Sequence, residues 1–508
     1  MRFALSGLAV LCVASVARAA QARGTTNSDH DWITFELAGR RIASTFQDLD
    51  GDGRQDLVIV TIDDREPSPQ RWLQIHRAEA DRSLPKDPSQ RLAVPAIAAT
   101  LIFGNHTADA GIEIGFLAPD GVYVYPKQGA TLLEPATKLI HTRTFFRAPS
   151  ASSLPIWSWG TDLDGDGLYD LLVPTPDGYT VYLQSEAGRY GRVTRLESGV
   201  PADQALERVL VTDATAEHKS LESYALTVRR TLPRLFEADI DSNGTRDLVA
   251  FHGEWIRTFF QNPGGAFAAA SGVAERVPTL LTRPGNDLDK ATSAQFLDID
   301  GDGNVDLIVT KVRGTLDDLK SFITIHFGSG YGIYREDYVF ELGGISTSPG
   351  FVDFNGDGCA DVVTHVTRAD TLGKMLSSFW GDVEVSYKIY QFLPGERRFD
   401  RMSYQETIAV NKSAFDRGGL GQVSRLEFST DWTGNGLIDK IRIDPDGRMR
   451  VYEGALSPEK RITFGQTPVY TRTLPRQPPS VYYADFNGDR KTDAMMLEPR
   501  GLGLLLSK

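Results

Sequence analysis

A nine-residue acidic segment recurs seven times along this chain and strongly limits what the chain can fold into. The first copy, DLDGDGRQD from Asp48 to Asp56, carries oxygen-bearing side chains at positions 1, 3, 5 and 9, with glycines at positions 4 and 6. Carboxylates held this close together repel one another unless a cation compensates their charge. We therefore interpret each copy as a metal-binding loop. The candidate ligands are Asp48, Asp50, Asp52 and Asp56; Asp162, Asp164, Asp166 and Asp170; Asp239, Asp241, Asn243 and Asp247; Asp298, Asp300, Asp302 and Asp306; Asp353, Asn355, Asp357 and Asp361; Asp431, Thr433, Asn435 and Asp439; and Asp485, Asn487, Asp489 and Asp493.

The donor set favours calcium over magnesium. Calcium accepts six to eight oxygen ligands in a flexible geometry, whereas magnesium requires a smaller octahedron and retains its water. We predict up to seven structural Ca²⁺ ions. The copies that keep all four acids and both glycines should bind best, and they begin at Asp48, Asp162 and Asp298. The copies with replaced ligands or glycines should be weakest, and they begin at Asp431 and Asp485.

An EF-hand is the obvious alternative for such a segment, but it requires an acidic residue at position 12 and a following helix. Position 12 is never acidic in this chain; it is Ile59, Val173, Ala250, Val309, Thr364, Arg442 and Met496 in turn. Most copies are followed by a short apolar or β-branched run, such as LVIV after Asp56, which indicates a buried strand. Each loop is therefore expected to join two strands.

These loops resemble the FG-GAP/VCBS repeats that build calcium-bearing β-propellers, as in the heads of integrin alpha chains and in many exported microbial proteins. A second landmark strengthens the resemblance: an apolar strand, a glycine-containing turn and an aromatic residue. This landmark occurs at Thr180 to Gly191, Arg257 to Phe267, Ile323 to Gly332 and Ile389 to Phe399. The resemblance covers nearly all of the mature chain and implies an all-β propeller.

The repeat spacing favours eight blades. The first two explicit loops are separated by twice 57 residues, and a shift of 57 aligns the segment after Pro119 with the segment after Pro176. That register places a degenerate copy at Asn105, Thr107, Asp109 and Glu113, where we expect no tight metal binding. The loops then begin near residues 48, 105, 162, 239, 298, 353, 431 and 485. Units of this length suit four-stranded blades, with a seven-bladed ring as the alternative. Only two strands follow the last loop, so we predict that the strand around Trp32 to Leu37 completes the last blade.

The first 19 residues are predicted to be a secretory signal peptide. Arg2 is followed by an apolar run and by Ala17-Arg18-Ala19, the pattern of a cleavable leader. The propeller is then expected to span residues 20–508, to be exported to the periplasm or cell exterior and to contain no transmembrane segment. One cysteine, Cys359, remains at position 7 of a loop, where we expect it to contribute its backbone carbonyl. Bound metal would stabilise an exported chain that lacks disulfides.

The net charge is −13, and cleavage of the leader would make it two units more negative. Seven calcium ions would neutralise nearly all of this charge, and the acidic balance argues against a nucleic-acid partner. Zinc patterns, a nucleophile elbow and a phosphate-binding loop are absent from the sequence. His76 and His326 are expected to be packed on strands. Trp157 and Trp159 are expected to pack between blades, and Trp432, at position 2 of a loop, to lie in the core.

Extra residues in Gly199–Leu232, Arg368–Asp382 and Arg313–Lys320 are expected to gather on the face opposite the metal loops. Loops on a rigid scaffold commonly carry binding sites, so that face is the predicted surface for an unknown protein or glycan ligand, with Trp380 as one contact. Three functions stay open: a binding or adhesion module, which we favour, a polysaccharide lyase, and an assembly subunit. The first involves no catalysis, and the fold does not decide among them.

Overall fold

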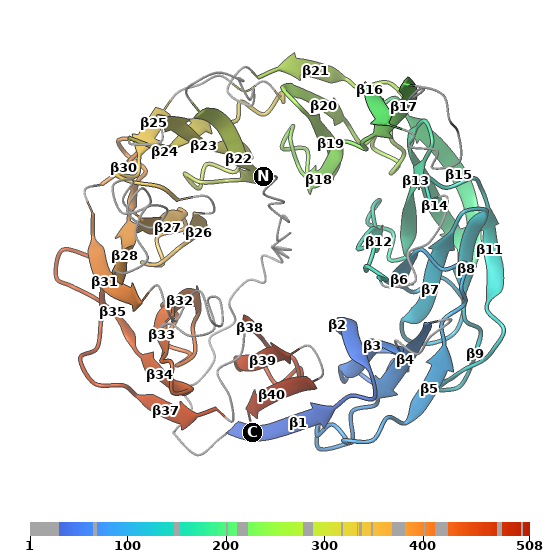
Figure 1. Ribbon diagram of the computed structural model, residues 1–508, viewed down its shortest axis with the longest axis horizontal. Helices are drawn as coiled ribbons and strands as arrows, with labels where there is room; N and C mark the ends of the chain where they lie inside the picture. The colour runs from blue at the N-terminus through green and yellow to red at the C-terminus, as the bar shows by residue number, and fades with distance from the viewer. Residues whose placement is uncertain are drawn as a thin grey trace, which may run out of the picture.

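The computed structural model describes residues 30–507 except 64–68, 147–152, 200–201, 211–221, 278–287, 316–317, 333, 335–337, 347–348, 368–381, 401, 412–424, 475–479 and 499–500. The secondary structure of these residues is entirely β, and eight four-stranded antiparallel sheets form a ring around a central axis (Figure 1). The first strand of each sheet lies nearest the axis and the fourth lies on the rim. The chain is therefore an eight-bladed β-propeller, as predicted, and the seven-bladed alternative is wrong.

The first four blades follow the chain in order. Blade 1 contains β2 (Arg40–Gln47), β3 (Asp56–Asp63), β4 (Gln70–His76) and β5 (Gln90–Ala93), and blade 2 contains β6 (Thr100–Gly104), β7 (Glu113–Ala118), β8 (Gly121–Val124) and β11 (Thr137–His141). Blade 3 contains β12 (Gly160–Thr161), β13 (Asp170–Thr175), β14 (Gly178–Glu186) and β15 (Arg189–Leu196), and blade 4 contains β18 (Arg234–Ala238), β19 (Asp247–His252), β20 (Trp255–Phe259) and β21 (Val273–Arg276).

The remaining blades complete the ring. Blade 5 contains β22 (Leu288–Leu297), β23 (Asp306–Gly314), β24 (Lys320–His326) and β25 (Tyr338–Glu341), and blade 6 contains β26 (Gly350–Val352), β27 (Asp361–Thr367), β28 (Asp382–Tyr390) and β31 (Tyr404–Asn411). Blade 7 contains β32 (Arg425–Thr430), β33 (Asp439–Ile443), β34 (Arg448–Tyr452) and β37 (Tyr470–Thr473), and blade 8 contains β38 (Ser480–Ala484), β39 (Asp493–Glu498), β40 (Gly501–Ser507) and β1 (His30–Glu36).

Four two-stranded hairpins lie outside the eight four-stranded sheets. They are β9 (Lys127–Gln128) with β10 (Thr131–Leu132), β16 (Ala202–Leu210) with β17 (Glu222–Arg230), β29 (Phe392–Leu393) with β30 (Arg398–Phe399), and β35 (Gly454–Leu456) with β36 (Ile462–Phe464). The described residues contain no helix that is long and apolar enough to cross a membrane.

The first described strand closes the ring. β1 pairs antiparallel with β40, from His30 opposite Ser507 to Glu36 opposite Gly501, and so supplies the outer strand of blade 8. Phe35 of β1 is 1% exposed and packs with Leu57 of blade 1 and Leu504 of blade 8. This confirms the predicted closure and joins strands from the two ends of the chain.

The hydrophobic core is divided among the interfaces between neighbouring blades. On β3, Val58 and Val60 pack toward blade 2, whereas Leu57 and Ile59 pack toward blade 8. Most second strands are covered on both faces, which explains why they read as continuous apolar runs instead of alternating patterns. The exception is β33, where partly exposed Lys440 and Arg442 alternate with buried Ile441 and Ile443. The predicted core tryptophans behave accordingly: Trp157 and Trp159 pack between blades 3 and 4, and Trp432 is 5% exposed between blades 7 and 8.

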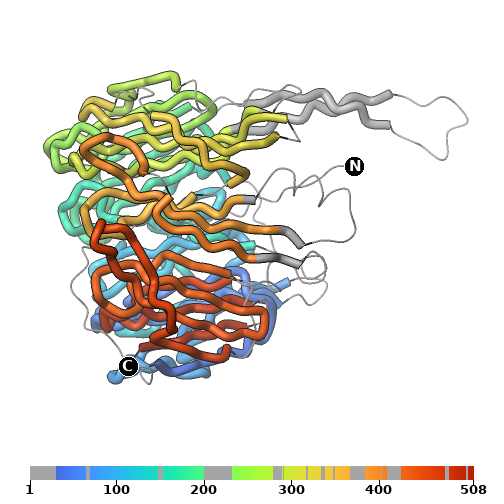
Figure 2. Tube along the Cα trace, turned by 90° about the vertical axis from the view of Figure 1, so that its left-hand side faces the viewer, coloured from blue at the N-terminus to red at the C-terminus, as the bar shows by residue number. Residues whose placement is uncertain are grey.

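The metal loops and the long insertions lie on opposite faces of the ring. Every metal loop joins the first and second strands of its blade, so connections between second and third strands emerge at the other end. Figure 2 shows the ring from its edge, with the blades stacked side by side. The insertion Gly199–Leu232 contains the β16–β17 hairpin and connects blade 3 to blade 4, and Arg313–Lys320 lies between β23 and β24. Residues 368–381 of the third insertion, including Trp380, lie outside the described residues.

Candidate metal-binding loops

All seven acidic loops have the same backbone arrangement, which the carboxylate at position 1 organises. Asp48 accepts hydrogen bonds from the Asp52 N–H through Oδ1 at 3.1 Å and from the Gly53 N–H through Oδ2 at 2.9 Å. The loop at Asp431, predicted to be weak, keeps these two bonds, because Asp431 accepts from Asn435 at 3.1 Å and from Gly436 at 2.7 Å. The changes at positions 3 and 5 therefore alter the ligands and leave the bonds to position 1 intact, although Asp439 accepts a hydrogen bond from the Thr433 N–H of position 3 at 2.7 Å.

Position 6 of these loops requires a left-handed backbone. Gly53 has φ of 82°, a conformation that glycine adopts without steric cost. In the last loop Arg490 occupies this position with φ of 67°. Such a conformation costs a residue with a side chain on the order of 1 kcal/mol. This cost is present with or without a bound ion, so it lowers the stability of the folded loop and does not by itself weaken ion binding.

Carboxylates converge closely enough for one ion to contact several of them. In four loops, three carboxylate oxygens lie within 4.8 Å of one another, as a cation with oxygen ligands at about 2.4 Å requires. These groups are Asp48, Asp50 and Asp52; Asp162, Asp164 and Asp170; Asp239, Asp241 and Asp247; and Asp298, Asp300 and Asp302. The geometry and the hard, anionic donors fit calcium.

The aspartate at position 9 has a structural role that the sequence did not reveal. Asp170 is fully buried, and its two oxygens accept hydrogen bonds from the Leu163 N–H at 2.9 Å and from the Gln184 N–H at 2.7 Å. The first bond returns to position 2 of the loop, and the second reaches the third strand of the blade. Asp56 makes the same two bonds, to Leu49 at 3.2 Å and to Ala78 at 2.9 Å. This residue therefore ties the loop to the sheet, whether or not it also binds metal.

Burial makes these aspartates costly as anions. It raises the pKa to about 7 for Asp170, Asp306 and Asp361, and to about 6 for Asp56, Asp247, Asp439 and Asp493. Backbone N–H groups oppose the pKa increase, whereas neighbouring loop carboxylates add to it. A divalent cation in the loop would lower these pKa values, because it favours the charged form of each ligand.

The degenerate loop of blade 2 already contains a cation. The Lys127 ammonium lies 3.0 Å from Glu113 Oε1, and the two side chains are 1% and 0% exposed. The ammonium also donates to the Ala110 carbonyl at 2.5 Å in its own loop and to the Leu49 carbonyl at 3.2 Å in the loop of blade 1. Glu113 in turn accepts from the His106 N–H at 2.6 Å. A tethered ammonium thus compensates the carboxylate at position 9.

Lys127 could have been found by extending the repeat register. It follows Glu113 by fourteen residues, the same separation at which Gln184 follows Asp170 and Gln261 follows Asp247. These glutamines also reach the preceding blade: the Gln261 amide donates to the Leu163 carbonyl at 2.6 Å. The residue fourteen positions after position 9 therefore connects its blade to the preceding one. In blade 2 this residue is the charged Lys127 instead of a glutamine.

Arginines compete for two of the loops predicted to bind best. Arg397, on the turn between β29 and β30 of blade 6, reaches the loop of blade 5, where its Nε is 2.7 Å from Asp300 Oδ2 and its Nη2 is 3.1 Å from Asp302 Oδ2. Arg77 lies 3.3 Å from Asp56 in the loop of blade 1. A fixed positive charge beside a ligand set opposes cation binding, so acid content alone does not determine the affinity.

Cys359 is buried, and its Sγ donates to the Asp300 carbonyl of the neighbouring blade at 3.2 Å. Burial raises the pKa of this thiol to about 12, and nearby aspartates add to the effect. Burial and a high pKa make a thiol a poor nucleophile. His76 and His326 are 1% and 2% exposed on β4 and β24, which confirms that they are packed.

A cavity of about 500 Å³ adjoins the loop of blade 3. Asp164 and Asp166 of that loop, Arg192 of β15 and Asn262 of blade 4 all line it. Arg192 donates a hydrogen bond to the Gly264 carbonyl, which joins blade 3 to blade 4 beside the cavity. A cation bound in this loop would be accessible from the cavity.

No protein-family model and no curated protein sequence matches this chain. Among solved structures, the chain is similar to a lectin of Agrocybe aegerita that recognises non-reducing terminal N-acetylglucosamine, with 15% identity over 95% of this chain and 96% of the lectin and a TM-score of 0.39. It is also similar to Sqt1 of Chaetomium thermophilum bound to the N-terminus of ribosomal protein L10, with 12% identity over 94% of this chain and 100% of Sqt1 and a TM-score of 0.40.

Proposed function

We propose that this chain is an exported, calcium-braced β-propeller of the FG-GAP/VCBS kind that acts as a binding module. The observation that carries the proposal is the repeated loop in which a buried aspartate ties acidic side chains to the end of the third strand. Burial and neighbouring carboxylates disfavour the charged form of each such aspartate, and calcium would favour it in the seven blades other than blade 2. In this proposal, calcium binding contributes directly to folding.

Recognition is assigned to the face opposite the metal loops. On that face, the β16–β17 hairpin lies in the crossing from blade 3 to blade 4, and residues 368–381, outside the described residues, separate β27 from β28. The expected lengthening in blade 5 goes mostly into the strands, because residues 315–319 alone join β23 to β24. A rigid ring that presents variable connections suits ligand binding, because the scaffold holds its loops in place without further ordering. The leader pattern of residues 1–19, which lie outside the described residues, supports export.

Calcium dependence is tested by thermal unfolding of the full mature chain. Chelation is expected to lower the Tm by many degrees, calcium should restore most of the loss, and magnesium little of it. Equal Tm values with and without chelator would overturn the calcium part of the proposal. N-terminal sequencing of secreted protein should begin at Ala20, and an uncleaved chain retained in the cytoplasm would overturn the export part.

Binding itself is tested by screening the calcium-loaded chain against arrays of glycans and of extracellular proteins. A ligand whose binding is lost when loops on the opposite face are replaced would support the assignment. A ligand that depends only on the face bearing the metal loops would overturn it.

A polysaccharide lyase is the second candidate, because Arg192 and the acidic loop of blade 3 share one cavity. Lyase chemistry also needs a base that removes a proton from the sugar. The described lining of this cavity includes no histidine, tyrosine or lysine. Formation of an unsaturated product from an acidic polysaccharide would favour the enzyme, and its absence across such substrates would favour the binding module.

A further inference from the structure

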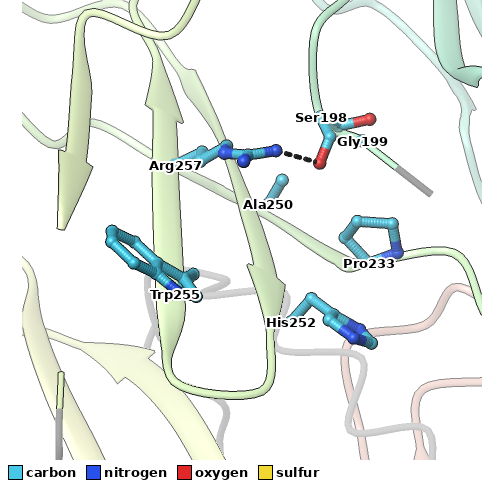
Figure 3. A pocket seen from close by; sticks show the side chains of 7 residues that line it. All are labelled: Ser198, Gly199, Pro233, Ala250, His252, Trp255 and Arg257. Atoms are coloured by element: carbon cyan, nitrogen blue, oxygen red, sulfur yellow. Dashed lines mark hydrogen bonds between the residues drawn. The ribbon is translucent and has the colours of Figure 1, made fainter. Parts of the chain in front are cut away.

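A second cavity lies between blades 3 and 4 at the end of the sheets remote from the metal loops. It has a volume of about 340 Å³ and is lined by Ser198, Gly199, Pro233, Ala250, His252, Trp255 and Arg257 (Figure 3). His252 and Trp255 flank the turn that joins β19 to β20, so the cavity opens on the face to which binding was assigned above.

Strand register places four of the lining side chains on one face of the β19–β20 hairpin. Ala250 is opposite Arg257, and His252 is opposite Trp255, so the four alternate along the two strands. Figure 3 shows Arg257 at one end of the group and His252 and Trp255 at the other, near the turn. The face therefore presents a small apolar floor with polar and aromatic groups around it.

Arg257 is held in position and retains unused donors. Its Nη1 donates to the Ser198 carbonyl at 2.7 Å and to the Glu197 carbonyl at 3.4 Å, which fixes the guanidinium against the end of blade 3. Its Nε and Nη2 make no hydrogen bond with any described residue. A guanidinium that is anchored through one nitrogen loses little side-chain entropy when the others bind an anion.

The aromatic groups are likewise available to a ligand. Trp255 is 46% exposed, which is unusual for an indole, and His252 is partly exposed. Neither ring has a hydrogen-bond partner among the described residues. An accessible indole face binds the C–H face of a sugar ring, and imidazole and guanidinium donate to its oxygens.

We propose that this cavity binds a pyranose ring that carries a carboxylate, such as a uronic acid unit of an acidic glycan. Trp255 stacks on the ring, Arg257 binds the carboxylate, and His252 binds a hydroxyl. The described lining contains a guanidinium but no carboxylate side chain, which favours an anion, and the volume lies at the lower end of the range for small-molecule sites. A peptide is disfavoured, because β20 is paired on both sides and offers no free backbone edge.

This inference rests on the proposed function, since it names the ligand class for that binding face. The test uses calorimetry on the full calcium-loaded chain with methyl β-glucuronide and methyl β-glucoside, which differ only in the carboxylate. The glucuronide should bind at least about tenfold more tightly, because charge-assisted hydrogen bonds to Arg257 are strong. Equal affinity for the two sugars, or no glucuronide binding at millimolar concentration, would overturn the inference.

Variants locate the site. Trp255→Ala and His252→Ala should each weaken glucuronide binding, the former by about tenfold. Arg257→Gln should reduce the preference for the glucuronide to within about twofold, and its Tm reports whether loss of the Ser198 contact disturbs the fold. The matched control is Tyr331→Ala. Tyr331 is an aromatic residue that is 73% exposed in a loop of blade 5, so this variant should bind the glucuronide as tightly as the wild type does.

Two outcomes separate this inference from the proposal on which it rests. If the array screen finds a ligand whose binding Trp255→Ala leaves intact, the binding module stands and this cavity is not its site. If a short peptide with a free terminal carboxylate binds more tightly than the glucuronide, the cavity binds carboxylates but the sugar assignment is wrong.

Discussion

Lys127 places its ammonium 3.0 Å from the Glu113 carboxylate, with both side chains excluded from solvent in the loop of blade 2. The seven acidic loops hold several carboxylates and are proposed to need an external cation. Blade 2 instead holds one buried carboxylate, that of Glu113, and the Lys127 ammonium neutralises its charge. The pair also reaches the Leu49 carbonyl, so it braces blade 1 against blade 2.

Replacement of Lys127 by methionine should strongly destabilise the protein. The substitution keeps most of the side-chain volume but leaves the Glu113 charge buried and unpaired, which costs about 3–5 kcal/mol. Urea unfolding at neutral pH measures the loss. Addition of Glu113→Gln to Lys127→Met should recover a large part of it, since no buried charge then remains.

The control is Lys138→Met in the same blade. Lys138 pairs with Asp120 in a solvent-accessible position, with side chains 22% and 58% exposed. Its loss should have little effect on the free energy of unfolding, because solvent screens an exposed ion pair. Similar losses at Lys127 and Lys138 would contradict the view that burial makes the first pair important.

Two aspartates of blade 3 should respond differently to chelation. Asp170→Ala should lower the unfolding free energy with or without calcium, because two buried N–H groups lose their acceptor at about 1–3 kcal/mol each. Asp166→Ala should matter mainly when calcium is present, since Asp166 is exposed and its proposed role is that of a ligand. Urea midpoints measured in chelator and in saturating calcium provide the comparison. Equal sensitivity of the two variants in chelator would refute this division of roles.

Removal of Arg397 should strengthen calcium binding at the loop of blade 5. Its guanidinium contacts Asp300 and Asp302, so a bound cation must displace it or tolerate its charge. We expect Arg397→Met to increase calcium affinity at this loop several-fold, measured by calorimetric titration at fixed ionic strength. Arg398→Met is the neighbouring control, since Arg398 pairs with Glu396 away from the loop. An unchanged or weaker affinity after Arg397→Met would show that the arginine supports the site.

His106 should make stability fall at acid pH. Burial lowers the pKa of His106 to about 4, below the ordinary value near 6.5. Between pH 6.5 and pH 4, His106 is protonated in the unfolded chain but neutral in the folded chain. Its contribution to stability is therefore complete above pH 6.5 and is lost as the pH falls toward 4. The difference in unfolding free energy between wild type and His106→Gln should shrink by about 2 kcal/mol from pH 7.5 to pH 5.

The control for this measurement is His141→Gln, which changes an exposed histidine of β11 in the same blade. The difference in unfolding free energy between this variant and the wild type, measured over the same pH range, is the reference for the His106→Gln series. If the difference in unfolding free energy between the wild type and His106→Gln did not shrink toward pH 5, the buried imidazole would not be the source of the pH dependence.

The sequence by itself determined the number of blades, the end of each blade that carries the acidic loops, and the closure by an N-terminal strand. It could do so because each loop is a local motif: the aspartate at position 9 begins the second strand, and the apolar run that follows is buried on both faces of its sheet. Repetition of that motif at nearly regular intervals then specifies a ring.

Only the tertiary structure decided which groups meet between blades. Lys127 reaches the loop of blade 1, Arg397 reaches from blade 6 into blade 5, and Arg257 of blade 4 holds the end of blade 3 to form a cavity. Each contact joins residues that are 59 to 97 positions apart or lie in different repeats. The packing angle between neighbouring sheets brings such residues together, and no local pattern of hydrophobic, acidic or turn residues encodes that angle.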